Sequence, residues 1–233
     1  MEPPVIEKMD DNTPVIAFSK VTFSYPNGKV LFQDLSLELA GGSFYLVHGP
    51  SGSGKSTFLR LINRLEEPSR GQLMFEGRPL TSYNPPLLRR EILYIQQTPT
   101  SVETTVRENL LLAFSFKNNR DLTPPDDDIL RSRMDNFLLN DIHLDTRAST
   151  LSVGQLQRLC FVRGLLLNPK VLLLDEPASA LDEESARIVE ETAEQMCVES
   201  GLTVLMVSHR TFRPARARHK MLQIVKGQIE LLT

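Results

Sequence analysis

A glycine-rich turn, Gly49–Thr57 (GPSGSGKST), directly follows the short apolar run Phe44–Val47. Its spacing, Gly-x-x-x-x-Gly-Lys-Ser, is typical of turns that bind phosphate groups between a buried strand and a helix. Glycine permits positive φ angles, so successive backbone N–H groups can point into one concavity. A helix beginning at Gly54 would add the positive end of its dipole. The turn therefore predicts a strand–turn–helix unit that binds a nucleotide through its phosphates.

The side chains at the end of this turn have separate expected roles. Lys55 would place its ammonium group on the β- and γ-phosphates, and the Ser56 hydroxyl would ligate Mg²⁺. Thr57 would contact the α-phosphate. Kinases, GTPases and motor proteins share this kind of turn, so the turn alone predicts nucleotide binding and no particular activity.

A pair of carboxylates, Asp175 and Glu176, follows a second apolar run, Val171–Leu174. The run predicts a buried strand, and the ligands of an open α/β sheet bind at the carboxyl ends of its strands. Asp175 would hold Mg²⁺ there, directly or through water, and Glu176 would orient and deprotonate an attacking water. The alternative interpretation of this pair is an ordinary acidic exit from a strand.

Apolar patterns elsewhere predict an α/β fold. Alternating strand and helix signals indicate a parallel sheet with right-handed crossovers. The helix after the glycine turn should stop near Glu66–Pro68, and Asp182 should cap a later helix. Residues 98–166 lack strand signals and predict an inserted helical lobe. The predicted strands are Ile16–Tyr25, Lys29–Leu39, Phe44–Val47, Val171–Leu174 and Thr203–Val207.

Composition narrows the class of protein. The 233 residues carry a net charge of −3, which gives no argument for nucleic-acid binding. No apolar run approaches the ~20 residues of a membrane span, and the acidic N-terminus lacks a secretory signal pattern. We therefore expect a soluble, intracellular protein with a flexible tail at residues 1–14. Cys160 and Cys197 lack the spacing of a zinc site and are expected to be buried thiols.

The stretch Leu151–Arg158 (LSVGQLQR) closely resembles the LSGGQ signature of ATP-binding-cassette (ABC) ATPases. Other elements of that family follow in the same order as in the family, so the resemblance covers nearly the whole chain. They are Tyr25 for the aromatic residue that stacks on adenine, Gln97 for the Q-loop glutamine (with Gln96 as a competing candidate), Ser179-Ala180-Leu181-Asp182 for the D-loop, and His209 for the switch histidine.

The resemblance implies a P-loop NTPase (RecA-like) fold, with a parallel sheet core, an N-terminal antiparallel β subdomain and an inserted α-helical subdomain. Residues 15–233 would form a single ABC ATPase domain. Its core would comprise residues 15–97 and 167–233. The helical subdomain would comprise residues 98–166 and carry the signature.

The resemblance also implies a set of site residues. Glu176, His209, Lys55 and Gln97 would act in ATP hydrolysis, with Glu176 activating water and His209 contacting the γ-phosphate. The nucleotide-binding residues would be Tyr25, Gly49, Pro50, Ser51, Gly52, Ser53, Gly54, Lys55, Ser56 and Thr57. The Mg²⁺ ligands would be Ser56, Gln97 and Asp175. The signature residues would be Leu151, Ser152, Val153, Gly154 and Gln155, and the D-loop residues Ser179, Ala180, Leu181 and Asp182.

In this family the signature of one subunit closes on the ATP held by the other, so the resemblance implies an ATP-dependent homodimer with a two-fold interface. Val153 departs from the family pattern, which has glycine at this position. Valine strongly disfavours positive φ, so we expect an ordinary backbone conformation there and an active site that still works. The Ser152 hydroxyl and the N–H groups at Gly154 would meet the phosphate.

Two classes of function fit an ABC ATPase of this length. The first is the ATPase subunit of a transporter, located peripherally on the cytoplasmic face of the cell membrane. Its separate membrane subunit would dock near Gln97 and Thr98–Arg107, and no nucleic-acid partner is expected. The alternative is a soluble ABC ATPase that acts on DNA or ribosomes, but such relatives usually carry a coiled-coil insertion, zinc-binding cysteines or two cassettes. A small-molecule kinase would not need Leu151–Gln155.

The sequence does not identify the transported substance. The turn Gln97–Thr100 and the compact length are similar to small bacterial cassettes of the iron-export type. Phosphate, amino-acid and lipoprotein systems use similar cassettes, so this similarity does not single out one substrate. The direction of transport also stays open. The basic stretch Arg210–Lys220 suggests nucleic acid or anionic lipid as one interpretation, and a short surface helix leading to the last strand as the other.

Overall fold

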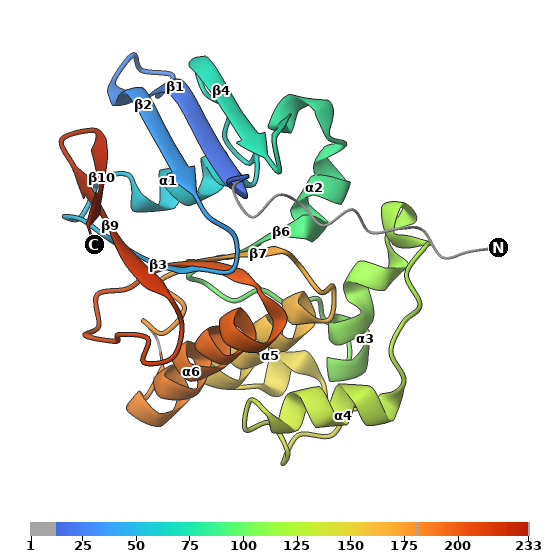
Figure 1. Ribbon diagram of the computed structural model, residues 1–233. Helices are drawn as coiled ribbons and strands as arrows, with labels where there is room; N and C mark the ends of the chain where they lie inside the picture. Colours follow the sequence, from blue (N-terminus) through green and yellow to red (C-terminus); the bar gives the residue numbers. More distant parts are fainter. Residues whose placement is uncertain (1–12, 180, 233) are drawn as a thin grey trace.

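Figure 1 shows the computed structural model of the protein, which describes residues 13–179 and 181–232. The expected flexible tail, residues 1–14, therefore lies almost wholly outside the described residues, as does Ala180. The strands are β1 (Ile16–Ser24), β2 (Val30–Leu39), β3 (Phe44–His48), β4 (Arg70–Phe75), β5 (Arg78–Pro79), β6 (Ile92–Ile95), β7 (Val171–Asp175), β8 (Thr203–Val207), β9 (His219–Val225) and β10 (Gln228–Leu232). The α-helices are α1 (Lys55–Ile62), α2 (Pro85–Glu91), α3 (Val106–Leu111), α4 (Asp127–Asp135), α5 (Val153–Leu165) and α6 (Glu183–Ser200). Short 3₁₀ turns are η1 (Leu80–Ser82), η2 (Leu112–Ser115), η3 (Lys117–Asn119) and η4 (Ala148–Thr150).

The strands form two sheets, one antiparallel and one mainly parallel. The antiparallel sheet has the order β2-β1-β4-β5, and the second sheet has the order β10-β9-β3-β8-β7-β6. Val207 of β8 is in register with Val47 of β3 on one side and with Asp175 of β7 on the other. Three parallel strands thus end at one level, so the segments that follow them meet at one edge of the sheet.

The parallel sheet is buried on both faces because its strands alternate between two hydrophobic cores. Val171 and Leu173 of β7 face a core shared with α1 and the antiparallel sheet. Leu172 and Leu174 face a second core built with α5 and α6. Figure 1 shows the same layers, with the antiparallel sheet above the parallel strands and helices α3–α6 below. Continuous apolar runs are what a doubly covered parallel strand requires.

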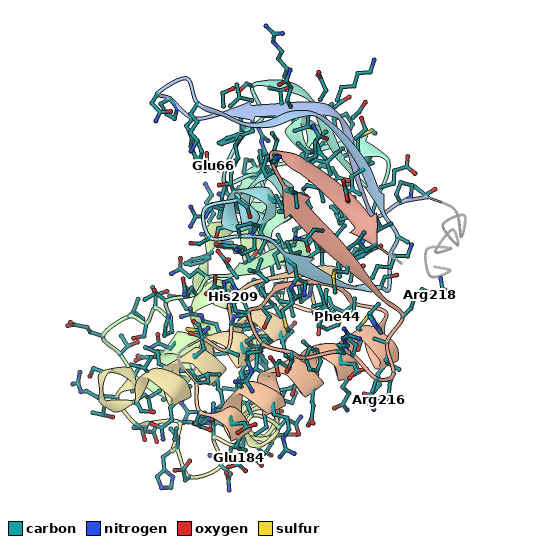
Figure 2. The ribbon with its side chains drawn as sticks, turned by 90° about the vertical axis from the view of Figure 1, so that its left-hand side faces the viewer. Phe44, Glu66, Glu184, His209, Arg216 and Arg218 are labelled. Atoms are coloured by element: carbon teal, nitrogen blue, oxygen red, sulfur yellow. The ribbon has the colours of Figure 1, made fainter. Side chains whose placement is uncertain are left out.

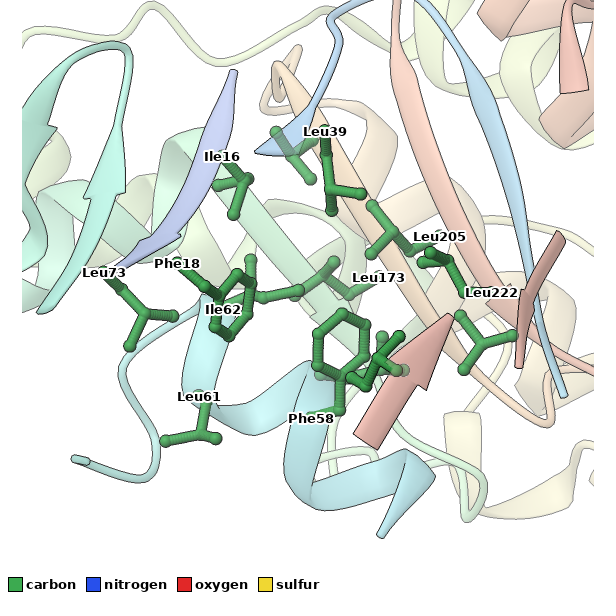
Figure 3. Close-up of a cluster of buried hydrophobic side chains, with 14 of the residues drawn as sticks. Ile16, Phe18, Leu39, Phe58, Leu61, Ile62, Leu73, Leu173, Leu205 and Leu222 are labelled. Carbon is green, nitrogen blue, oxygen red and sulfur yellow. The ribbon is translucent and has the colours of Figure 1, made fainter. Parts of the chain in front are cut away.

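The first core holds α1 against both sheets (Figure 3). Phe58 of α1 is fully buried, and its ring stacks on that of Phe18 of β1 with centroids 5.3 Å apart. Ile62, one helical turn further on, is also fully buried. This apolar face fixes the direction of α1, and therefore the position of the turn that precedes it.

The fold class predicted from the sequence is confirmed, and the predicted strands agree with the structure to within a residue at most ends. The helix after the glycine turn is shorter than expected, because α1 ends at Ile62. Arg64 then adopts a left-handed φ of 57°. Its guanidinium binds the backbone carbonyls of Leu80 and Tyr83, and these bonds hold the chain away from the helix axis.

The prediction of a short surface helix in Arg210–Lys220 is wrong. The segment carries no helix before β9 begins at His219. The buried carboxylate of Glu194 on α6 accepts hydrogen bonds from the backbone N–H groups of Arg216 and Ala217, which hold this backbone against α6 in a bend. Figure 2 shows Arg216 and Arg218 in this segment.

Between β6 and β7 the described residues form helices and turns, together with one isolated bridge from Thr105 to Arg147. The strands β6 and β7 pair in parallel, so this whole segment is inserted between neighbouring strands of the sheet. The inserted helical subdomain is therefore present. Its exact limits, residues 98–166, and those of the two core segments stay a proposal.

Candidate functional site

The glycine turn after β3 is closely surrounded, and two of its glycines leave no room for a side chain. A Cβ at Gly49 would lie 2.6 Å from Ser53 Oγ and 2.8 Å from the backbone oxygen of Ile224. Gly54 precedes α1 with a left-handed φ of 99°, and a Cβ there would lie 2.7 Å from Leu31 Cδ2. The two glycines therefore allow the turn to wrap tightly before α1 begins, as predicted from their spacing.

Lys55 is buried within this turn, with 7% of its surface exposed. Its Nζ donates to the backbone oxygens of Gly49, at 3.0 Å, and Pro50, at 3.1 Å. The buried hydroxyl of Ser53 has no hydrogen-bond partner among the described residues. A cation and an unpaired hydroxyl thus lie in a turn whose following helix directs backbone N–H groups toward the same end. This arrangement is suited to an anionic ligand.

Asp175 lies at the end of β7 and is buried, with 5% exposed. Ser56 Oγ donates to its Oδ1 at 3.0 Å, and Tyr94 Oη on β6 donates to its Oδ2 at 2.6 Å. Burial, with a contribution from the bond to Asp175, raises the pKa of Tyr94 to about 12, so the phenol keeps its proton and remains a donor. Arg60 Nε of α1 donates in turn to Tyr94 Oη at 3.4 Å.

Glu176 adopts a left-handed φ of 50°, and its carboxylate lies between two candidate residues. Gln97 Nε2 is 3.1 Å from Oε2, and His209 Nε2 is 3.1 Å from Oε1. His209 follows β8, and Figure 2 shows it at the surface between the sheets and the lower helices. Three residues far apart in the sequence therefore meet around one carboxylate at the sheet edge.

Gln97 also connects this cluster to the predicted D-loop, because its Nε2 is 3.3 Å from Ser179 Oγ. Leu181 and Asp182 continue that loop into α6, where the Asp182 carboxylate accepts the N–H of Ser185 and caps the helix. This hydrogen bond, with a second one from the Ser185 hydroxyl, lowers the pKa of Asp182. Gln96, the competing candidate, instead lines a groove described below.

Tyr25 lies beside the glycine turn, as its predicted role requires. Its hydroxyl is 3.1 Å from Thr57 Oγ1, and its ring packs edge-on against Phe23. Pro50, Ser51 and Gly52 occupy the tip of the turn, where Ser53 N donates to the Pro50 oxygen at 3.2 Å. All predicted nucleotide-binding residues are thus contiguous in space with the turn or form part of it.

The predicted signature begins helix α5 with a capping box. Ser152 Oγ accepts the N–H of Gln155 at 3.2 Å, and Gln155 Oε1 accepts the N–H of Ser152 at 2.9 Å. Because Oγ acts as the acceptor, the hydroxyl hydrogen of Ser152 can still be donated to a ligand. Val153 and Gly154 have helical φ values, so the prediction of an ordinary backbone conformation at Val153 is confirmed. The Val153 side chain is 58% exposed.

Two side chains of the site were missed in the sequence. Tyr94 is the first; the only signal for it was the short apolar run Ile92–Ile95 before the candidate glutamines. Arg158 of α5 is the second, and its guanidinium contacts the hydroxyl of Ser185, which also bonds to Asp182. The helix that begins with the signature is thereby joined to the start of the helix that follows the D-loop.

The predicted residues divide into two groups by the hydrogen bonds that their side chains make. The first unites the glycine turn, Asp175, Glu176, Gln97 and His209 at the sheet edge. In the second, the start of α5, the Ser152 hydroxyl and backbone N–H bond to Gln155, and the Ser152 carbonyl accepts the N–H of Leu156 within the helix. One chain therefore presents a phosphate-binding cluster and, on a different element, a helix N-terminus with a free hydroxyl hydrogen.

The donor atoms at Ser56 and Asp175 fit Mg²⁺. They are a hydroxyl and a carboxylate oxygen 3.0 Å apart. The described residues contain no group of three or more His, Cys, Asp or Glu side chains that could hold a metal by themselves. So small a set suits an ion that keeps several waters and shares phosphate oxygens with its ligand. Gln97, the third predicted ligand, is hydrogen-bonded to Glu176 and Ser179 instead.

A groove of about 530 Å³ opens where β6 leads into the helical subdomain. Phe116 lines it and is 53% exposed. Cys160 and Arg163 of α5 line its other side.

Both cysteines, Cys160 and Cys197, are buried, as predicted. In the part of the chain that the structure describes, no helix is both long enough and apolar enough to span a lipid bilayer.

Comparison with known proteins places this chain in a family. The family model described as "ABC transporter" matches residues 32–179. The "Probable iron export ATP-binding protein FetA" of Escherichia coli is 36% identical over 86% of this chain and 87% of its own length. The "Sophorolipid transporter" of Starmerella bombicola is 36% identical over 84% of this chain, which spans 16% of that protein.

The fold agrees with a solved structure as well. The chain superposes on a bacterial Atm1-family ABC exporter with ATP bound, with a TM-score of 0.82 and 24% sequence identity. The likeness covers the whole of this chain and 41% of that one. The chain thus spans most of one relative and a minor part of others that are much longer.

Proposed function

The chain belongs to the ABC transporter family as one of its ATP-binding, ATP-hydrolysing domains, and from this premise we propose that two copies close on two ATP molecules to drive a separate membrane-spanning subunit. The observation that carries the proposal is the division of the site into two groups on one chain. The phosphate-binding cluster around Lys55 would hold ATP, and the start of α5 at Ser152 would complete the site of the second copy. A two-fold pair satisfies both groups at once.

The proposed hydrolysis uses residues that lie together at the edge of the parallel sheet. Lys55 would leave the carbonyls of Gly49 and Pro50 to pair with the β- and γ-phosphates. Glu176 would accept a proton from the attacking water, and His209 would orient that carboxylate and contact the γ-phosphate. Bound Mg²⁺ at Ser56 and Asp175 would supply charge that offsets the developing negative charge on the phosphate oxygens.

Ser152 is the residue with which we propose to test the shared site. Replacing Ser152 by Ala should lower ATPase activity on the order of 100-fold, because a donor to the phosphate of the partner copy is lost. The loss of the cap should also destabilise the protein by about 1 kcal/mol. Thr105 caps α3 with an equivalent capping box and provides the matched control.

Thr105→Ala should cause a similar fall in thermal stability while leaving the ATPase activity of the isolated chain within about twofold. Steady-state phosphate release and thermal unfolding of both variants separate the two effects. Equal losses of activity in the two variants would mean that Ser152 acts through helix stability alone.

We propose the groove beside Gln96 as the docking site of the membrane subunit. Support comes from its apolar lining and from its position between the sheet edge and the helical subdomain. Gln97, which bonds to Glu176, lies between the lining residues Gln96 and Thr98, so movement of Gln97 would displace the lining. A chain docked there would act at the cytoplasmic face of the membrane. The name of the Escherichia coli relative makes export of a metal ion the first cargo class to test.

Replacing Phe116 by Asp should reduce capture of the membrane subunit from detergent-solubilised membranes of the source organism at least tenfold, because a charge would enter the apolar groove. Ile129 of α4 is similarly exposed, at 47%, and Ile129→Asp is the matched control outside the groove. Both variants should keep the ATPase activity of the isolated chain. Equal capture by parent and Phe116→Asp would place the membrane subunit elsewhere.

A further inference from the structure

Asp175 has a hydrogen bond on each carboxylate oxygen, and the two bonds come from different elements. Ser56 of α1 occupies Oδ1, whereas Tyr94 of β6 occupies Oδ2 at 2.6 Å. Ser56 and Asp175 are the residues proposed above to hold Mg²⁺. The bond from Tyr94 is made to the oxygen that Ser56 does not contact, so the phenol does not compete for the oxygen that adjoins the Ser56 hydroxyl.

We propose that Tyr94 is a positioning residue that holds the Asp175 carboxylate in the orientation needed to bind Mg²⁺ together with ATP. The inference rests on the proposed metal site at Ser56 and Asp175. Tyr94 itself would touch neither nucleotide nor metal. Its effect would pass through the carboxylate, as is common for the outer partners of metal ligands.

The sheet gives this contact a fixed geometry. Tyr94 lies in β6, which pairs in parallel register with β7, and Asp175 is the last residue of β7. Tyr94 lies opposite Leu173, and the next pair along the two strands is Ile95 with Leu174. The pairing of β6 with β7 therefore fixes the position of the Tyr94 backbone relative to that of Asp175. Little conformational freedom remains for either side chain in the bond between the phenol and Oδ2.

Because Asp175 is buried, loss of the hydrogen bond from Tyr94 would have a large effect on its carboxylate. Asp175 is 5% exposed, so an oxygen deprived of its donor would be left almost without water. In the variant Tyr94→Phe, the Asp175 carboxylate would turn to recover a partner, and Oδ1 would turn with it. Arg60 contacts the same phenol from α1, at 3.4 Å, so one hydroxyl joins the helix of the glycine turn to two neighbouring strands.

The test is nucleotide binding with and without the metal. Calorimetry with the non-hydrolysable analogue AMP-PNP, titrated in EDTA and at graded Mg²⁺ concentrations, gives the Mg²⁺ concentration for half-maximal enhancement of binding. Tyr94→Phe should raise that concentration roughly tenfold, the lower limit for loss of an outer partner. Affinity for AMP-PNP in EDTA should stay within twofold of the parent.

Tyr83 supplies the matched control. Its hydroxyl donates to the backbone oxygen of Phe75 at 3.0 Å, so Tyr83→Phe also removes one phenol hydrogen bond, away from the site. It should leave the Mg²⁺ dependence unchanged. Tyr94→Leu removes the ring as well as the hydroxyl and should shift the Mg²⁺ dependence no less than Tyr94→Phe. A shift in Tyr94→Leu with none in Tyr94→Phe would overturn the proposal, because the ring and not the hydroxyl would then matter.

Asp175→Asn separates this inference from the metal site on which it rests. Unchanged Mg²⁺ dependence in Asp175→Asn would overturn the site and the inference together. A shift in Asp175→Asn with none in Tyr94→Phe would overturn the inference alone. An equal loss of affinity with and without Mg²⁺ in Tyr94→Phe, or a similar shift in Tyr83→Phe, would also overturn it.

Discussion

Replacing Glu176 by Gln is expected to leave ATP affinity within a few-fold of the parent and to reduce steady-state hydrolysis at least 100-fold, the minimum usually lost with a general base. The amide keeps the shape of the side chain, which lies between Gln97 and His209. It does not accept a proton from water. The nucleotide site should therefore form normally and stop before cleavage.

The control for Glu176 is a carboxylate of the same kind outside the site. Glu184 is exposed on the first turn of α6, and Figure 2 shows it among the lower helices, apart from His209. Glu184→Gln should hydrolyse ATP at the parent rate. Phosphate release under saturating ATP, with ATP affinity measured separately, distinguishes a lost base from a lost site. Hydrolysis by Glu176→Gln at the parent rate would assign the base to another residue.

Replacing Lys55 by Ala is expected to weaken ATP binding on the order of 100-fold, because the turn loses the cation that would pair with two phosphates. Lys55 is 7% exposed and sits against the oxygens of Gly49 and Pro50. Its stem also fills space in the turn. Lys55→Met keeps most of that stem and removes the charge, so it isolates the electrostatic part of the effect.

Equilibrium binding of ATP to both Lys55 variants, in the presence of Mg²⁺, measures this loss. Lys117 is exposed in η3 and supplies the control, since Lys117→Ala should bind ATP as the parent does. If Lys55→Met binds ATP as tightly as the parent, the phosphate charge is not balanced at this position and the proposed pocket is wrong.

The sequence was informative wherever the site is made from contiguous residues. The glycine turn and the run that ends at Asp175 each contain their own strand signal, because strands buried on both faces are continuously apolar. Alternation between two cores, as for Leu172 and Leu173, leaves that signal unbroken. The order of these elements along the chain then indicates the fold.

Contacts between distant segments were not accessible in the same way. Strand β6 has four residues and was missed, so the reach of Tyr94 to Asp175 was invisible. The hydrogen bond from Arg158 to Ser185 joins two helices and has no local pattern. The basic stretch beyond His209 was misread for a similar reason, since the carboxylate that binds its backbone N–H groups belongs to Glu194 on α6.

The most direct test of the paired site is the mass of the Glu176→Gln chain in solution, measured by sedimentation velocity with and without ATP and Mg²⁺. The account predicts a species near 26.3 kDa without nucleotide and one of twice that mass with saturating ATP. Adding Ser152→Ala to the same chain should abolish the larger species. A Glu176→Gln chain that binds ATP tightly and still sediments at 26.3 kDa would contradict it.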